Sequence, residues 1–134
     1  MTSDRVGDFI IRLQNASMIG SKTVVAPYSS HIEAIARKLK SLGYLSDVEV
    51  VAIGDSEVKK NLKVTLVYGD KGEPKLRGVK RISKPGRRLY VGHEDAHSVA
   101  GGTGARIIST PSGILTDREA RKTHVGGENL FEIW

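Results

Sequence analysis

The sequence predicts an α+β fold in which an N-terminal α/β half, with two helices and three strands, packs against a β-rich C-terminal half with short helices. Two segments of the first half carry apolar residues at helical spacing. Beyond residue 74, short apolar runs alternate with glycines, as is typical of short strands joined by turns. Residues 69–74 are polar and rich in turn formers, so we expect a linker there and domains at 1–68 and 75–134.

Two helices are expected in the first half. The first has apolar residues at positions i, i+3, i+4 and i+7, namely Val6, Phe9, Ile10 and Leu13. The second is expected to begin at a capping box, Ser30-His31-Ile32-Glu33, where a hydroxyl and a carboxylate satisfy free backbone N–H groups. Its apolar stripe comprises Ile32, Ile35, Ala36, Leu39 and Leu42. We expect Gly43 to end it.

Strands are expected at 24–27, 45–53 and 62–68 in the first half. In the third of these, apolar and polar residues alternate, which predicts that one face contacts solvent. In the second half, strands are expected at 79–82, 89–91, 105–110, 114–115 and 129–134, with helical turns near 94–99 and 117–123. The second of these turns follows another predicted capping box, Thr116-Asp117-Arg118-Glu119.

The composition points to nucleic acid, or an anionic membrane surface, as the first class of partner. The chain of 134 residues has a net charge of +6, and its pI is near 9.7. Eight of its 21 Lys and Arg residues lie between Lys71 and Arg88, against the single acid Glu73. Glycines and a proline interrupt this run, so we interpret it as a phosphate-contacting edge in preference to a solvated charged face.

Several other classes of site are excluded or disfavoured. The chain has no cysteine, which excludes disulfides and thiolate metal sites. The first residues include early acids and no long apolar run, so we expect neither a signal peptide nor a membrane span. Histidines 31, 93, 97 and 124 lack metal-ligand spacing, and Gly101-Gly102-Thr103-Gly104 lacks the lysine of a P-loop, so this glycine run is interpreted as a strand-entry turn. We expect no metal and no cofactor.

A cluster of hydroxyls is the most distinctive feature of the second half. Ser109, Thr110 and Ser112 lie within four positions, beside Pro111 and Gly113. No serine elbow and no legible catalytic base accompanies them, so they are poor candidates for nucleophiles. Turn residues need no function, but an uncrowded hydroxyl surface also suits the wide, shallow minor groove of A-form RNA.

Two further segments are candidates for RNA contact. Gly126-Gly127-Glu128 precedes the last expected strand, where the glutamate either is a solvated turn residue or binds backbone, hydroxyl or base amino groups. Tyr90 follows the Arg87-Arg88 pair and either stacks on a base or sugar or packs in the core.

These residues, taken together, resemble the bacterial small-subunit ribosomal protein S8 family. The resemblance rests on ordered blocks along nearly the whole chain, at residues 8–16, 81–90, 102–104, 109–121 and 125–134. It implies a two-domain α+β protein of the cytoplasmic ribosome that is not an enzyme. Such a protein is a structural constituent of the small subunit and a primary rRNA-binding protein, which grips an irregular helix in the central domain of small-subunit rRNA and supports assembly and translation. Its other implied partners are neighbouring small-subunit proteins and, in some members, the mRNA of its own operon.

The resemblance also implies roles for particular residues. The Ser109-Thr110 loop and Gly113 would meet the minor groove and an extruded base, and Tyr90 would lie near the sugar-phosphate backbone. Gly126, Gly127 and Glu128 would order the loop. Lys84, Arg87 and Arg88 would hold phosphates. Many members have a serine and a basic or amide residue where this chain has Pro111 and Ser112, which places Ser112 below Ser109 and Thr110.

Two other functions stay open at this point. One is a translational repressor that acts on mRNA, with incorporation into the ribosome secondary. The other is a small RNA-processing enzyme, for which Glu128 and His124 would be the nearest acid–base pair.

Overall fold

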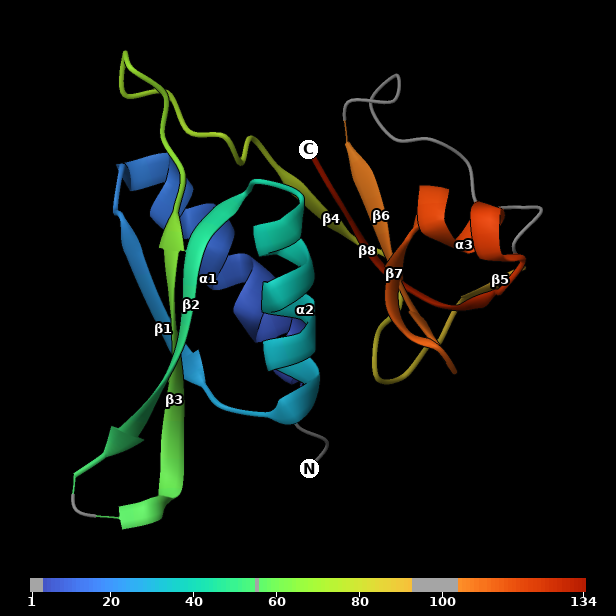
Figure 1. Cartoon of the computed structure of the whole chain (residues 1–134), viewed down its shortest axis with the longest axis horizontal. Helices are drawn as coiled ribbons and strands as arrows, with labels where there is room; N and C mark the ends of the chain where they lie inside the picture. The colour runs from blue at the N-terminus through green and yellow to red at the C-terminus, as the bar shows by residue number, and fades with distance from the viewer. Residues whose placement is uncertain (1–3, 55, 93–103) are drawn as a thin grey trace. The chain divides into compact units, whose positions relative to one another are not determined.

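The computed structural model describes residues 4–54, 56–92 and 104–134. The chain divides into two compact units, Asp8–Arg77 and Gly78–Trp134, the latter together with Met1–Gly7. Within the described ranges, three helices and two antiparallel sheets confirm the α+β class, with the longer helices in the first half and a β-rich second half (Figure 1). Independent domains at 1–68 and 75–134 stay a prediction. None of the helices in the described residues is long and apolar enough to cross a membrane.

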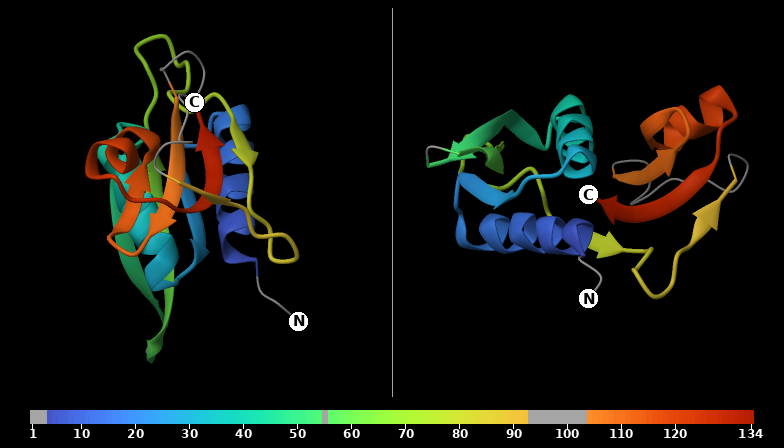
Figure 2. Two further views of the ribbon diagram at one scale, coloured as in Figure 1. Left: turned by 90° about the vertical axis from the view of Figure 1, so that its right-hand side faces the viewer. Right: turned by 90° about the horizontal axis from the view of Figure 1, so that it is seen from below.

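The first unit consists of helices packed on a three-stranded sheet. Its elements are α1 (Arg5–Ile19, whose first turn belongs to the other unit), β1 (Thr23–Pro27), α2 (Ser30–Ser41), β2 (Leu45–Ile53) and β3 (Ser56–Leu66). The strand order is β1-β3-β2, and all pairs are antiparallel. Both helices lie on the same face of the sheet (Figures 1 and 2).

The core of this unit follows the predicted apolar pattern. Its buried side chains include Phe9, Ile10, Leu13, Ile35, Leu39, Leu62, Val64 and Leu66. Lys63, between two of the buried β3 residues, is exposed, which confirms that one face of this strand contacts solvent. The predicted bounds of this strand, 62–68, are wrong at both ends. β3 starts earlier, at Ser56, where it pairs with β2, and it ends at Leu66, before Tyr68.

The start of α2 corrects a second prediction. The N-cap is Ser29, whose extended backbone lets its hydroxyl accept a hydrogen bond from the backbone N–H of Ile32 at 3.1 Å. Ser30 is already helical, so the predicted capping box does not form there. Glu33 accepts hydrogen bonds from Arg37 and Tyr28. Gly43 follows the helix with a φ of 91°, as its expected role as a terminator requires.

Residues 69–74, where a linker is expected, fall within the first unit and form a hydrogen-bonded turn. The backbone N–H of Gly69 donates to the carbonyl of Glu73 at 2.7 Å, and that of Lys75 donates to Val67 at 2.9 Å. An isolated bridge pairs Tyr68 with Pro74.

The described part of the second unit is a five-stranded antiparallel sheet with one short helix. Its elements are β4 (Val79–Arg81), β5 (Tyr90–Val91), β6 (Ala105–Thr110), β7 (Gly113–Thr116), α3 (Asp117–Thr123) and β8 (Gly127–Ile133). The order is β4-β8-β6-β7, and β5 pairs with β8 as well. Ile107, Ile108 and Phe131 are fully buried, and Ile108 clusters with Ala120 of α3. β8 therefore lies at the centre of the sheet.

The predicted capping box of α3 is confirmed. Thr116 Oγ1 accepts from the backbone N–H of Glu119 at 3.2 Å, and the Glu119 carboxylate accepts from the N–H of Thr116 at 3.1 Å. The helical turn expected near 94–99 and the turn expected at Gly101-Gly102-Thr103-Gly104 fall on residues 93–103, outside the described ranges.

Candidate nucleic-acid interface

Strand pairing brings three of the candidate residues into one row. Glu128 of β8 is the Cα partner of Tyr90 on one side and of Ser109 on the other. Directly opposite residues of antiparallel strands direct their side chains to the same face of the sheet. The phenol, the carboxylate and the hydroxyl therefore form a row across β5, β8 and β6, although 38 positions of the chain separate the first two.

Tyr90 is a surface residue. Its side chain is 73% exposed, so core packing, one of the two interpretations of the sequence, is wrong. An exposed aromatic ring at the end of a fixed strand can stack on a base or sugar with little further ordering.

The hydroxyl cluster divides into a closed turn and a free hydroxyl. Thr110 Oγ1 donates to the carbonyl of Gly113 at 2.8 Å and accepts from the backbone N–H of Ser112 at 3.1 Å, so Thr110 holds the β6–β7 turn closed. Gly113 has a φ of 110°, a conformation that favours glycine. Within the described residues the Ser109 hydroxyl forms no hydrogen bond and is half-buried, which leaves it available to a ligand.

Glycine is required where β8 begins. A β-carbon on Gly127 would overlap the backbone carbonyl oxygen of Ser109. The close approach of these two backbones sets the register in which Ser109 faces Glu128. Gly126 is half-buried just before this contact.

The basic residues of the β4–β5 loop are exposed and held by a tight turn. Lys84 and Arg87 exchange backbone hydrogen bonds of 3.0 and 2.9 Å around Pro85 and Gly86. Arg88 forms an ion pair of 2.9 Å with Glu128, and this hydrogen bond raises the pKa of Arg88. Sequence reasoning missed this link because the two residues lie 40 positions apart.

The basic run from Lys71 to Arg88 does not belong to a single element. Lys71, Lys75 and Arg77 lie in the first unit, and the other five lie in the second. Arg81 is also engaged internally, since its guanidinium binds the Asp4 carboxylate and donates to the Ser83 carbonyl at 2.7 Å. The predicted phosphate-contacting edge is therefore reduced in the second unit to four exposed side chains, those of Lys80, Lys84, Arg87 and Arg88.

Among residues 4–54, 56–92 and 104–134, no group of three His, Asp or Glu residues is placed to hold a metal ion. Glu128 is engaged by Arg88, while His124 is the exposed, left-handed C-cap of α3.

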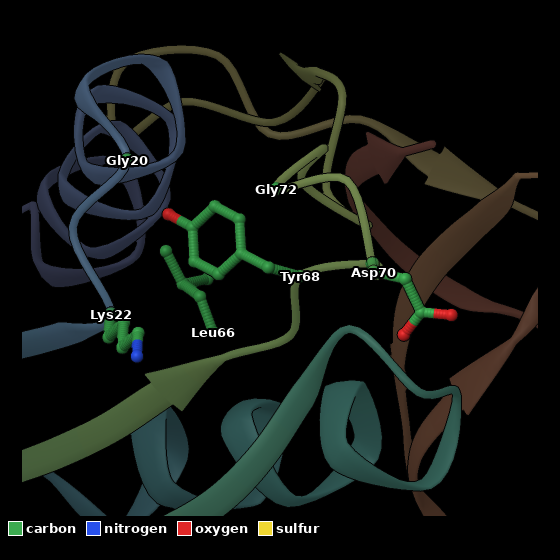
Figure 3. A pocket seen from close by; sticks show the side chains of 7 residues that line it. Gly20, Lys22, Leu66, Tyr68, Asp70 and Gly72 are labelled. Carbon is green, nitrogen blue, oxygen red and sulfur yellow. The ribbon is translucent and has the colours of Figure 1, made fainter.

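The first unit has an open pocket of about 500 Å³, lined by Gly20, Lys22, Leu66, Tyr68, Gly69, Asp70 and Gly72 (Figure 3). The Tyr68 hydroxyl donates to the backbone carbonyl of Ser21 at its wall. None of the candidate RNA-binding residues lines this pocket.

Comparison with known proteins gives a consistent result over the full chain. The model of the family described as "Ribosomal protein S8" matches residues 4–134. Proteins named small ribosomal subunit protein uS8 are similar: that of a Cyanothece species is 44% identical over 99% of this chain and 98% of its own. The protein from a Nocardioides species is 42% identical over 98% of each chain, and the one from Solibacter usitatus is 40% identical over the full length of both. This chain belongs to the ribosomal protein S8 family.

Proposed function

We propose that this protein binds small-subunit rRNA directly through its second unit and grips an irregular helix of the central domain. As a member of the ribosomal protein S8 family it is a structural protein of the small ribosomal subunit and not an enzyme. Its partners are therefore rRNA and neighbouring ribosomal proteins.

The observation that carries the proposal is the row of Tyr90, Glu128 and Ser109, together with the closed turn beside it. It places a stackable ring, a hydrogen-bond acceptor and an unengaged hydroxyl on one face of a rigid sheet. A-form RNA presents 2′-hydroxyls and base edges in a wide, shallow minor groove. Because this groove is wide and shallow, a flat row of small polar groups on a sheet can contact it, and no protein helix has to enter the groove.

The residues around the row divide the work of binding. Lys84 and Arg87 are exposed and would contact phosphates, which supply most of the affinity and its dependence on salt. Ser109 and Tyr90 would contact sugars and bases and so select the RNA structure. Ser112, exposed at the tip of the turn, would add a peripheral contact.

The other candidate residues hold the backbone that carries the row. Thr110 and Gly113 close the turn, and Gly126 and Gly127 bring β8 against β6. Glu128 forms an ion pair of 2.9 Å with Arg88 and is also the strand partner of Ser109, so we expect Glu128 and Arg88 to act together.

The test is a titration of the full-length protein with a transcript of the rRNA central domain and with an unrelated structured RNA of equal length. Ser109→Ala should weaken binding to the transcript by about 1–3 kcal/mol, because the RNA group that bonds to the Ser109 hydroxyl would be buried in the complex without a hydrogen-bond partner. Its effect on the unrelated RNA should be small. The control is Ser41→Ala, which removes an exposed hydroxyl of α2 in the first unit that donates to the carbonyl of Lys38.

Equal losses on both RNAs for Ser109→Ala would remove that residue from the recognition surface. Equal affinity of the unaltered protein for both RNAs would refute direct rRNA recognition. Adding the mRNA of its own operon as a competitor would show whether the same row binds a mimic of the rRNA site.

A further inference from the structure

Ser83 is a buried serine of the second unit whose role the RNA-contact residues do not include. It lies just after β4, where the chain leaves the sheet and enters the basic loop, and only 3% of its surface is exposed. A buried hydroxyl is retained at little cost only when it is hydrogen-bonded, so its partners indicate its purpose.

The Ser83 side chain joins the two ends of the loop. Its hydroxyl accepts a hydrogen bond from the backbone N–H of Leu89 at 2.9 Å and donates to the backbone carbonyl of the same residue at 3.0 Å. One side chain thus satisfies both backbone groups of Leu89, six positions away.

The same two residues are fixed to the central strand of the sheet. The backbone N–H of Ser83 donates to the carbonyl of Asn129 at 3.1 Å, and the N–H of Asn129 donates to the carbonyl of Leu89 at 2.9 Å. Both ends of the loop are therefore held on β8, next to Glu128.

The loop that Ser83 closes contains three cations and no acid. Lys84, Arg87 and Arg88 are exposed, and each repels the other two. Arg88 is balanced by Glu128, but no ion pair to Lys84 or Arg87 is present among the described residues. Without a closed base, this repulsion would favour a spread and variable loop.

We propose that Ser83 is a positioning residue for RNA binding, which holds the loop closed so that Lys84 and Arg87 are presented to phosphates in one fixed arrangement. This inference rests on the proposed function. A loop that is ordered before binding loses less conformational entropy when it meets the RNA, so the hydroxyl contributes to affinity without touching the ligand.

A double-mutant cycle separates this role from simple structural support. Ser83→Ala is made in the full-length protein and, separately, in a background carrying Lys84→Gln and Arg87→Gln. Affinity for the central-domain transcript is measured for all four proteins at several salt concentrations, with thermal unfolding in parallel. If Ser83 acts through the two cations, Ser83→Ala should weaken binding about tenfold in the native background and less than about twofold in the other.

Ser17→Ala is the matched control. Ser17 is also a buried serine, in the first unit, and its hydroxyl donates to the backbone carbonyl of Leu76 at 2.6 Å. Its loss should lower the unfolding temperature in the same manner as Ser83→Ala while leaving RNA affinity unchanged.

The outcomes distinguish the two proposals. A loss of similar size in both backgrounds, or no loss in either, would overturn the positioning role even if the protein recognises the transcript. If the unaltered protein does not prefer the transcript to unrelated RNA, the proposed function fails and this inference falls with it. Should the alanine variant not fold, Ser83→Cys keeps a side chain of similar size with a weaker donor, and the same cycle decides the matter with it.

Discussion

The two units use their charged side chains differently. In the first unit two ion pairs join residues four positions apart on one helix, Asp8 with Arg12 on α1 and Glu33 with Arg37 on α2. Such pairs lie on an exposed helix surface, and each contributes a few tenths of a kcal/mol to the free energy of unfolding. Beyond its helix, Arg12 also donates to the backbone carbonyl of Val25 at 3.0 Å, and Glu33 also accepts from the Tyr28 hydroxyl at 3.0 Å, so both contacts stay within 13 positions of the chain.

The second unit has a pair of this kind in α3, but three pairs among its described residues join distant segments. Arg88 meets Glu128 across 40 positions, and Arg106 meets Glu132 across 26 at 2.9 Å. The second of these pairs is mostly buried, with 15% and 18% of the two side chains exposed. Long-range pairs fix strands relative to one another, so in this unit charge contributes to the register that assembles the candidate interface.

The largest effect should come from the backbone contact that sets this register. Gly127→Ala places a β-carbon against the Ser109 carbonyl oxygen, a backbone atom that cannot turn aside. The free energy of unfolding of the second unit should fall by about 3 kcal/mol. Urea unfolding followed by the fluorescence of Trp134, the single tryptophan and a residue of this unit, measures it.

Gly86→Ala is the control for that substitution. Gly86 lies in the same unit, has no atom within 4 Å of an added β-carbon and does not have a positive φ. The Gly86→Ala substitution should change the free energy of unfolding by less than about 1 kcal/mol. A Gly127 variant as stable as the Gly86 variant would show that β6 and β8 can separate slightly without cost, and would weaken the case for a rigid row.

A second, smaller effect follows from releasing Arg88. Glu128→Gln removes the acid that engages Arg88, so the freed cation can contact a phosphate. The log–log salt slope for unrelated RNA should steepen by about 0.7–0.9, and its affinity should rise by less than about tenfold. Preference for the rRNA transcript should fall, because the row loses its carboxylate. Filter binding at four salt concentrations measures both quantities.

Glu33→Gln makes the same charge change in the first unit and is closely matched. Its partner Arg37 is 54% exposed, against 49% for Arg88, and the two acids are 24% and 17% exposed. Preference for the transcript should survive in this variant. If both substitutions changed preference equally, net charge alone would explain the effect and the pairing of Arg88 with Glu128 would have no special role.

The difference between local and long-range contacts also explains which features could be predicted from the sequence. The apolar spacing of Phe9, Ile10 and Leu13 predicts α1 because a helix is a local structure whose pattern lies within a few residues. The capping box at Thr116 is equally local and was found, whereas Ser29 and Ser30 are adjacent serines that only backbone geometry distinguishes.

The candidate site could be predicted only in part. Tyr90, Ser109 and Glu128 were each selected, but their common row depends on the pairing of three strands, which no local pattern encodes. Ser83 was missed for the same reason, because its partner lies across a loop. Nothing in the sequence separated the engaged hydroxyl of Thr110 from the free one of Ser109.

A third effect, smaller than the first two, should come from the long-range ion pair of Asp4, the residue just before α1. The Asp4 carboxylate binds the Arg81 guanidinium and accepts from the backbone N–H of Gly7 at 3.1 Å, within the unit that Met1–Gly7 share with the second half. The Arg81 hydrogen bond is the main cause that lowers the pKa of Asp4 below its usual 3.8. Asp4→Asn keeps a cap for Gly7 but removes the charge, so stability at pH 7 should fall by at most about 1 kcal/mol.

The pH dependence of that loss identifies its origin. Because the folded-state pKa of Asp4 is lowered, its contribution is complete well above 3.8 and disappears as the pH falls through the lowered value. The difference in unfolding temperature between Asp4→Asn and the unaltered protein should therefore be constant near neutrality and vanish in strong acid. Asp8→Asn, which removes the local pair with Arg12, should cost less than about 0.5 kcal/mol. A larger loss for Asp8 than for Asp4 would contradict the view that long-range pairs stabilise this protein more than local ones.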